Sequence, residues 1–390
     1  MLSRVAAMGS ARLAGAMVGA MLVGSGNVVK NGINSSMGQV FGSTVIATTF
    51  GVTGAMLTCL LLEGLGAGRS RETAPWREAC AAVRPWMLVG GALGAVSVGS
   101  QTFLIGPIGA VLLHVIQLST ELFLAMIVDS IGCLGLKRRQ VTVVRVLGVI
   151  ISMLGAVATV GDFVGQTERA GAGPEHPAIG RAAQEPEPEN QAEGLVLAAY
   201  LSLAVLVGCC RPIQTVLNGG LKQALQSPVR AATVSITVSL LLLLLLSALQ
   251  LAFLPQLRPL FADAMSNDTQ LELWMATSGP MSTYSVVAPV VLAPIISLSG
   301  FSGASMTGQL FTSLLIDHIG WLSWRRPMTA MRLGGVGVVL AGALLVRWSD
   351  ARSAARVARA ASDAGDGGKA DERARLIKSG EGEGDDDGED

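Results

Sequence analysis

Long apolar runs alternate with short polar segments along most of this 390-residue chain. Each run has about 20 residues, the length that a helix needs to cross the hydrocarbon core of a bilayer. The pattern therefore predicts an all-α integral membrane protein with ten transmembrane helices. We expect the ten spans near residues 11–31, 38–62, 85–105, 107–131, 143–162, 195–217, 228–254, 275–297, 299–320 and 331–347.

A polar segment at residues 163–193 divides these spans into two groups of five. It contains EPEPENQAE, a Pro/Glu-rich stretch that cannot bury an apolar core, so we predict a disordered linker. The chain is then expected to consist of a first five-helix repeat (1–162), the linker (163–193), a second five-helix repeat (194–347) and a charged, disordered C-terminal tail (348–390).

The two groups of helices have similar sequences. VGSGNVVKNGINSSMGQ in the first group aligns with VGCCRPIQTVLNGGLKQ in the second, and the aligned stretches keep their order at a separation of about 185 residues. Three such pairs begin at Val23 and Val207, at Leu122 and Leu310, and at Arg145 and Arg332. This indicates a duplicated five-helix unit. Because five is odd, the two copies must enter the membrane in opposite orientations, and such inverted repeats are typical of secondary transporters.

Composition agrees with a membrane protein and argues against several functional classes. Hydrophobic residues make up 51% of the chain and charged residues 14%, and 28 basic residues balance 28 acidic ones. A net charge of zero gives no field that attracts a polyanion, so no nucleic-acid partner is expected. Five cysteines without a CxxC pair and three scattered histidines predict no metal site. No Walker A, HExxH or GxSxG motif occurs, so we expect neither an enzyme nor a cofactor.

Basic residues between the spans predict the orientation, because cytosolic loops of membrane proteins are enriched in Lys and Arg. With the N-terminus in the cytosol, the loops at 63–84 and 137–139 and the segment after Trp348 lie inside, and the acidic linker lies outside. Both termini of this multi-pass protein are therefore expected to be cytosolic. Arg325 and Arg326 oppose this orientation, since their loop would then lie outside.

The second repeat carries a recognisable series of motifs. RPIQTVLNGGL begins at Arg211, GQLFTSLLIDHIGW begins at Gly308, and RLGGVGVVLAGALLVR begins at Arg332. This series resembles the YdcZ-like family of inner-membrane exporters in the drug/metabolite transporter superfamily, over residues 14–347 apart from the linker. The resemblance implies ten helices in two repeats around a central cavity that binds a small-molecule substrate.

Polar residues inside the spans are the first candidates for a site, because polar groups are costly in a bilayer. The first helix of each repeat carries such residues at i, i+3, i+4 and i+7, on one helix face. They are Asn27, Lys30, Asn31 and Asn34 in the first repeat, and Arg211, Gln214, Thr215 and Asn218 in the second. Two interpretations remain open: the residues line a substrate cavity, or they are wetted helix ends whose cations extend to the interface.

The fourth predicted helix carries His114, Gln117 and Glu121 on one face. Glu121 lies about 21 Å along its span, deep in the hydrocarbon region. An unpaired carboxylate there favours its protonated form and suits proton coupling or cation binding, whereas a structural ion pair is the alternative. The equivalent residue is Gln309, and the resemblance implies Gln both there and at the position of Lys30. The opposite charges of Lys30 and Glu121 suggest that they compensate each other in one cavity.

Two carboxylates, Asp129 and Asp317, close matching helix ends. A carboxylate at a helix C-terminus opposes the helix dipole and needs a cation nearby. Arg145 and Arg332 begin the next predicted helices, 16 and 15 residues further on. We therefore predict the ion pairs Asp129–Arg145 and Asp317–Arg332 as structural clamps.

Small residues recur on the last helix of each repeat. Gly148 and Gly155 are seven residues apart, as are Gly335 and Gly342. This spacing allows close helix packing, either between the two repeats or in a homodimer formed through the fifth and tenth helices. Tyr284, in the eighth predicted helix, is either part of the cavity wall or an aromatic residue at the lipid interface.

Together these features predict a secondary transporter that exports a small metabolite or drug-like solute by alternating access, with Glu121 as the candidate for proton coupling. The alternative is a non-transporting membrane scaffold or a channel. A channel needs a continuous polar stripe through the membrane, whereas the polar residues here form limited layers.

Overall fold

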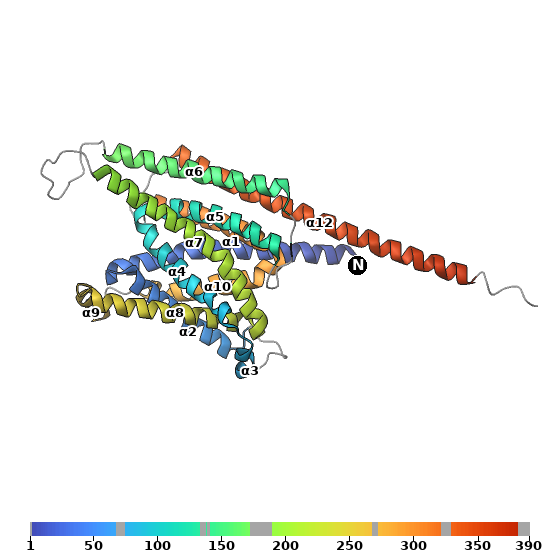
Figure 1. The fold of residues 1–390 in the computed structure, drawn as a ribbon, viewed down its shortest axis with the longest axis horizontal. Coiled ribbons are helices and arrows are strands. Elements are labelled where there is room, and N and C mark those ends of the chain that lie inside the picture. Colours follow the sequence, from blue (N-terminus) through green and yellow to red (C-terminus); the bar gives the residue numbers. More distant parts are fainter. Residues whose placement is uncertain are drawn as a thin grey trace, which may run out of the picture.

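The computed structural model describes residues 2–67, 75–132, 138, 141–171, 189–266, 272–320 and 329–380. Within these residues the chain is mainly helical and contains no strand, as the apolar runs predict. The helices form an elongated bundle, and the end of the last helix projects beyond the others (Figure 1).

The order of the helices matches the predicted order of the spans. The first half contains α1 (Leu2–Phe41), α2 (Thr44–Gly64), α3 (Trp76–Ala81), α4 (Pro85–Ile108), α5 (Ala110–Ile131) and α6 (Val143–Gly171). The second half contains α7 (Glu189–Leu225), α8 (Pro228–Phe253), α9 (Leu257–Ser266), the 3-10 helix η1 (Leu273–Thr277), α10 (Ser278–Ile296), α11 (Leu298–Ile319) and α12 (Ala330–Gly380).

Nine helices in the described part of the chain are long and apolar enough to cross a membrane. The remaining long helix is α11, whose first half, LSGFSGASMTGQ, mixes apolar residues with serine and glycine. Most residues of α11 are buried against other helices, so its polar side chains contact protein. The chain is therefore an all-α, multi-pass membrane protein in which hydropathy accounts for nine spans rather than ten.

Helical structure extends beyond the predicted spans at several places. α1 continues to Phe41, through the gap expected at residues 32–37, so α2 begins at Thr44 rather than near residue 38. α6 continues to Gly171 and α7 begins at Glu189, so both ends of the predicted linker are helical, while residues 172–188 lie outside the described residues. α12 continues to Gly380, through most of the segment predicted as a disordered tail. That prediction relied on charge and overlooked the stretch ARSAARVARAA, which is rich in the strong helix formers Ala and Arg.

Several residues used to predict the orientation cannot be placed. Residues 68–74, 133–137, 139–140 and 321–328, the last including Arg325 and Arg326, lie outside the described residues, as do the final residues 381–390. The predicted orientation therefore remains a prediction.

Helices of the first half pack mainly on helices of the second half. α6 pairs with α12, α5 with α11, and α2 with α8. The pairs run antiparallel: Thr49 of α2 bonds with Ser247 of α8, whereas Met56, further along α2, contacts Thr237, which is earlier in α8. α1 packs on α10 and α11, and α7 packs on α4 and α5. Most contacts of each half are therefore made with the other half, and neither half can form them alone.

Abrupt breaks separate α4 from α5 and α10 from α11. The residues at the two breaks, Gly109 and Ser297, have φ angles of 79° and 74°. Glycine adopts this left-handed conformation freely, but a residue with a Cβ does so at a cost of about 1–2 kcal/mol. The Ser297 hydroxyl offsets part of that cost by accepting a hydrogen bond from the N–H of Gly300 at 2.9 Å. The breaks place the first residues of α5 and α11 in the interior.

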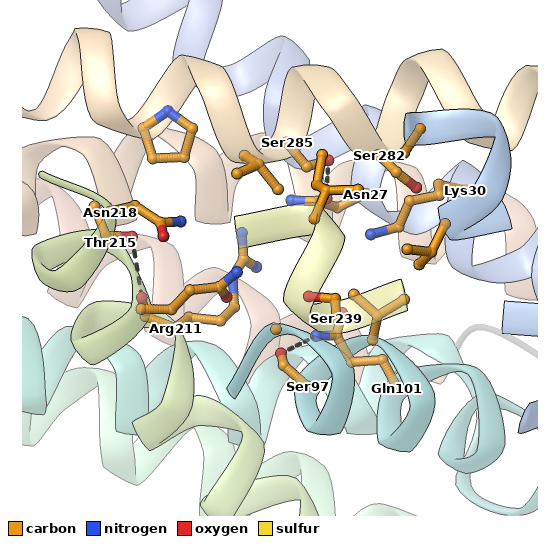
Figure 2. A pocket seen from close by; sticks show the side chains of 18 of the residues that line it. Asn27, Lys30, Ser97, Gln101, Arg211, Thr215, Asn218, Ser239, Ser282 and Ser285 are labelled. Carbon is orange, nitrogen blue, oxygen red and sulfur yellow. Dashed lines mark hydrogen bonds between the residues drawn. The ribbon is translucent and has the colours of Figure 1, made fainter. Parts of the chain in front are cut away.

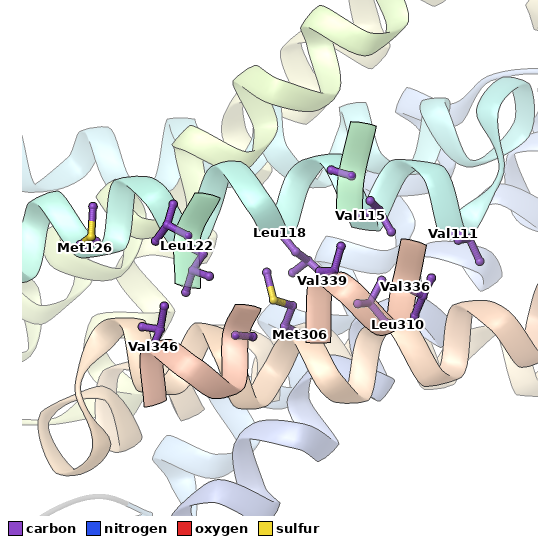
Figure 3. Close-up of a cluster of buried hydrophobic side chains, with 13 residues drawn as sticks. Val111, Val115, Leu118, Leu122, Met126, Met306, Leu310, Val336, Val339 and Val346 are labelled. Atoms are coloured by element: carbon purple, nitrogen blue, oxygen red, sulfur yellow. The ribbon is translucent and has the colours of Figure 1, made fainter. Parts of the chain in front are cut away.

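Apolar packing and apolar exposure together define the inside and the outside of the bundle. In Figure 3, Leu118 and Leu122 of α5 lie close to Met306 of α11 and Val339 of α12, within a cluster of buried side chains. In a bilayer this packing stabilises the bundle through van der Waals contact. Large apolar side chains also cover the outer faces, for example Phe311, which is 73% exposed. Such a surface suits contact with lipid tails.

Candidate functional site

A cavity of about 70 Å³ lies between α1, α2, α4 and α5 of the first half and α7, α8, α10 and α11 of the second. Figure 2 shows that polar side chains from several of these helices project into it. The polar lining residues are Asn27, Lys30, Ser97, Gln101, Glu121, Arg211, Gln214, Thr215, Asn218, Ser239, Ser282 and Ser285. The cavity thus collects polar groups that the hydrocarbon region would otherwise disfavour.

The two predicted polar stripes contribute to the lining unequally. All four stripe residues of α7 line the cavity, but on α1 only Asn27 and Lys30 do so. Asn31 instead donates from Nδ2 to Oε1 of Gln101 at 2.6 Å. Asn34 is fully buried beside α2, where its Oδ1 lies 2.7 Å from the position that a Cβ on Gly51 would take. Asn34 is therefore a helix-contact residue in this structure.

Glu121 contacts Arg211 rather than Lys30. Nη1 of Arg211 lies 3.7 Å from Oε2 of Glu121, and Oγ of Ser302 donates to Oε1 of Glu121 at 2.8 Å. The same guanidinium nitrogen donates to Oε1 of Gln309 at 3.5 Å, so Gln309 reaches Glu121 through Arg211. The sequence identifies Glu121 as a carboxylate that needs a cation, but not which of the two cations provides it.

Lys30 is buried, with 3% of its surface exposed. Its amine extends into the cavity from the side opposite Arg211 (Figure 2). In the part of the chain that the structure describes, no hydrogen bond or ion pair involves the Lys30 amine. The predicted compensation between Lys30 and Glu121 is therefore not a direct contact, although both residues line one cavity.

His114 and Gln117 share α5 with Glu121 but lie outside the lining of the cavity. Nδ1 of His114 is 2.7 Å from the carbonyl oxygen of Ala110 and 3.1 Å from the hydroxyl of Ser313. Gln117 is fully buried where α5 meets α7. Both residues therefore make interior helix contacts in this structure.

Tyr284 also lies outside the cavity lining, although Ser282 and Ser285 on the same helix line it. Its side chain is 42% exposed, and its hydroxyl donates to the carbonyl oxygen of Gly19 on α1 at 3.1 Å. The exposed position therefore puts Tyr284 on the outer face of the bundle and not in the cavity wall.

Each predicted ion pair at the helix ends is formed. Nη2 of Arg145 donates to Oδ2 of Asp129 at 2.5 Å, and Nη2 of Arg332 donates to Oδ2 of Asp317 at 2.5 Å. All four residues are buried. Each pair joins the end of one helix to the beginning of the next long helix in the same half.

The same two carboxylates also cap helices of the opposite half. Asp129, near the end of α5, accepts a hydrogen bond from the N–H of Ser299 at the start of α11 (3.1 Å). Asp317, near the end of α11, accepts from the N–H groups of Ala110 (3.3 Å) and Val111 (3.2 Å) at the start of α5. The first N–H groups of a helix have no partner within the helix and carry partial positive charge. α5 and α11 therefore cap each other, a relation that spacing along the chain could not reveal.

Two further acidic residues were not identified from the sequence. Oδ1 of Asp350 lies 3.4 Å from Nε of Arg145, so that arginine contacts two carboxylates. Glu63 accepts from Nε of Arg230 at 3.0 Å and from Nε1 of Trp76 at 3.1 Å. Asp350 falls in the segment predicted as a tail, and Glu63 and Arg230 flank predicted loops, where charges are normally solvated. The sequence signal that could have suggested a role for Asp350 is the Ala- and Arg-rich stretch around it, which favours a continued helix.

The predicted glycine stripes face each other within one chain. A Cβ on Gly148 would lie 2.7 Å from the carbonyl oxygen of Gly342, and a Cβ on Gly155 would lie 2.7 Å from that of Gly335. α6 and α12 therefore approach too closely for any larger side chain. These glycine faces are occupied inside the chain and are not available to a second copy.

An apolar outer surface, a polar interior cavity and nine candidate spans define an integral, multi-pass membrane protein. Among the described residues, no group of three or more His, Cys, Asp or Glu side chains could hold a metal ion. The family model described as "Putative inner membrane exporter, YdcZ" matches residues 15–158 and 199–345. The chain therefore belongs to this family, whose name indicates a transporter rather than an enzyme. No curated protein matches the chain.

Proposed function

We propose that the protein is a secondary transporter that exports a small solute by alternating access. The observation that carries this proposal is the polar cavity, which is walled by helices of both halves. A site held between two halves opens to one side or the other when the halves move relative to each other. The family's description as an exporter supports the same class of function.

An arrangement of ten spans as two inverted repeats supports this mechanism. Helices that are equivalent in the two sequence repeats cross each other antiparallel, as the pairing of Gly148 with Gly342 and of Gly155 with Gly335 illustrates. Close approaches also recur: a Cβ on Gly24 of α1 would collide with α11, and a Cβ on Gly208 of α7 would collide with α5. We therefore count α11 as a tenth span, despite its lower hydropathy.

We place both termini in the cytosol. In this orientation Asp129, Arg145 and Asp350 lie at the cytosolic end of the bundle, whereas Asp317 and Arg332 lie at the outer end. The two clusters would tie α5 to α11 at each end, so these two helices would keep their contact while the other helices move around the cavity.

We assign proton coupling to Glu121. Its partner Arg211 belongs to α7, and its second contact, Ser302, belongs to α11, so the carboxylate of the first half is held by two helices of the second. Protonation would remove the charge of Glu121 and weaken its contact with Arg211. Since that contact joins the two halves, a change in protonation would shift the balance between their arrangements.

Cysteine accessibility tests the alternating cavity. In a cysteine-free background, Ser97→Cys and Ser282→Cys place a thiol in the cavity lining on α4 and α10. A membrane-impermeant thiol reagent should label both variants in right-side-out and in inside-out vesicles. Ser313→Cys is the control, because Ser313 is buried on α11 outside the lining and should stay unlabelled.

The outcomes separate the candidate functions. A scaffold with a closed cavity gives no labelling of Ser97→Cys or Ser282→Cys from either side. A channel gives labelling from both sides together with ionic conductance in planar bilayers. Labelling from both sides without conductance is the result that alternating access requires.

A further inference from the structure

The charges that line the cavity do not balance. The ionisable lining residues are Lys30, Glu121 and Arg211. Glu121 and Arg211 form an ion pair at 3.7 Å. Their charges cancel, so the Lys30 amine leaves the lining with a formal charge of +1.

The described helices that pack on α1 around Lys30 give it no carboxylate. α9 carries Asp263, but it packs at the end of α1 near Phe41, about three helical turns beyond Lys30. α4 and α10, which pack on α1, have no charged residue. α2 has only Glu63, which bonds with Arg230 at its far end, and the carboxylate of α11, Asp317, bonds with Arg332. A buried ammonium ion without a partner is costly, so a counter-charge from outside the described chain would stabilise this site.

A neutral donor lies beside Lys30. Asn27 is three residues earlier on the same face of α1 and also lines the cavity. Its Oδ1 accepts from Oγ of Ser285 at 2.5 Å, and its buried Nδ2 has no hydrogen-bond partner among the described residues. An ammonium group and an amide N–H that share one wall are complementary to an oxyanion, which accepts charge-assisted hydrogen bonds.

We propose that the cavity binds a small anionic solute through a carboxylate or phosphate group, with Lys30 as the charge partner and Asn27 as a hydrogen-bond donor. This inference rests on the proposed function, because it takes the cavity to be the substrate site. It differs from the cation-binding role that the sequence suggests for Glu121, since Arg211 already neutralises that carboxylate. A cation in the cavity would add to an uncompensated positive charge, whereas an anion removes it.

The repeat supplies a matched substitution. Gln214 of α7 occupies the position equivalent to Lys30 of α1 and lines the same cavity. Lys30→Gln therefore gives both repeats the same residue at this position. Lys30→Arg keeps the charge. Lys222→Gln is the control, because Lys222 lies outside the lining and bonds to the carbonyl oxygen of Val290 at 3.2 Å.

Thermal unfolding of the purified protein measures binding, because a ligand that binds the folded state raises the unfolding temperature. The probes are inorganic phosphate, lactate and tetramethylammonium, in a buffer whose anion is a bulky sulfonate. Phosphate or lactate should stabilise the wild type, and tetramethylammonium should not. Lys30→Gln should weaken anion binding at least about 30-fold, as expected when a desolvated charge partner is removed. Lys30→Arg should retain most of the binding, and Lys222→Gln all of it.

Unliganded protein gives a second readout. Lys30→Gln should unfold at a higher temperature than the wild type without ligand, because an unpaired buried charge is removed. If Lys30→Gln does not fold, Lys30→Met serves the same purpose, and the comparison of anions with tetramethylammonium on the wild type decides independently.

Three results overturn the proposal: stabilisation by tetramethylammonium alone, no stabilisation by either anion, or equal anion binding by Lys30→Gln and wild type. Flux into proteoliposomes separates this inference from the proposed function. Anion binding through Lys30 without any flux would refute transport and keep the anion site. Flux of a cationic or neutral solute without anion binding would keep transport and refute the anion site.

Discussion

Replacing Glu121 by Gln is expected to destabilise the protein, even though the equivalent residue of the second half is Gln309. The substitution leaves Arg211 without its carboxylate, so the cavity then contains two unpaired cations, Arg211 and Lys30. Arg211→Gln has a related effect, because it leaves Glu121 as a buried anion. Combining the two substitutions removes both charges, so the double variant should lose less stability than the sum of the two single losses.

The expected size follows from the geometry of the pair. Oε2 of Glu121 and Nη1 of Arg211 are 3.7 Å apart, with 4% and 13% of the respective side chains exposed. At an effective dielectric constant of about 20, Coulomb's law gives about 4.5 kcal/mol for this separation. The distance is longer than the roughly 2.8 Å of a hydrogen-bonded ion pair, which reduces the attraction. We expect each single substitution to cost about 3–5 kcal/mol and the coupling free energy to be about 2–3 kcal/mol.

A double-mutant cycle measures this coupling. The free energy of unfolding is determined in mixed micelles by titration with SDS, for the wild type, Glu121→Gln, Arg211→Gln and the double variant. Ser302→Ala is a control, because it removes only the hydrogen bond to Oε1 of Glu121 and should cost about 1–2 kcal/mol. If the losses of the two charge substitutions add to within about 0.5 kcal/mol, Glu121 and Arg211 do not stabilise each other and the reasoning is wrong.

Four further predictions concern the helix ends, packing, orientation and coupling. In a thermal unfolding assay, Arg332→Gln should restore the stability lost in Asp317→Asn. Arg145→Gln should not restore the stability lost in Asp129→Asn, because Arg145 also contacts Asp350. Equal rescue at both ends would contradict this prediction. Gly155→Leu should destabilise by at least about 1–3 kcal/mol through collision with α12, whereas Gly334→Leu, with open space around it, should cost little in the same assay. An impermeant thiol reagent should label Gly194→Cys but not Ala351→Cys in intact cells, and the reverse pattern would invert the proposed orientation. In proteoliposomes, Glu121→Gln should abolish the response of solute flux to a pH gradient, and an unchanged response would make Glu121 a structural residue.

The periodic placement of apolar residues is a reliable guide to the helices, because crossing a bilayer requires a minimum length of apolar chain. It is a poorer guide to α11, which is covered by other helices and can therefore contain many serines. The apolar run at 299–320 still predicts a span there, and the similarity of this segment to α5 supports that prediction. Helix ends are also poorly predicted, since α12 continues on local helix propensity long after its apolar character ends.

The sequence could predict several residues of the candidate site, but not which of them contact each other. Spacing places Lys30 and Arg211 on the polar faces of their helices, and both side chains line the cavity. A carboxylate in hydrocarbon shows that a cation is needed, yet the choice between Lys30 and Arg211 depends on helix tilt and depth. Those are tertiary quantities, set by how closely helices such as α5 and α7 approach each other at Gly208.

The mutual capping of α5 and α11 bears on how the protein is made. While only the first half has been synthesised, the N–H groups of Ala110 and Val111 lack the acceptor that Asp317 later provides. Unsatisfied backbone groups in a bilayer cost several kcal/mol each, so an isolated first half is an unstable biosynthetic intermediate. The two halves, expressed as separate polypeptides, should therefore find each other in the membrane and survive together, whereas either half expressed alone should be removed by cellular proteolysis.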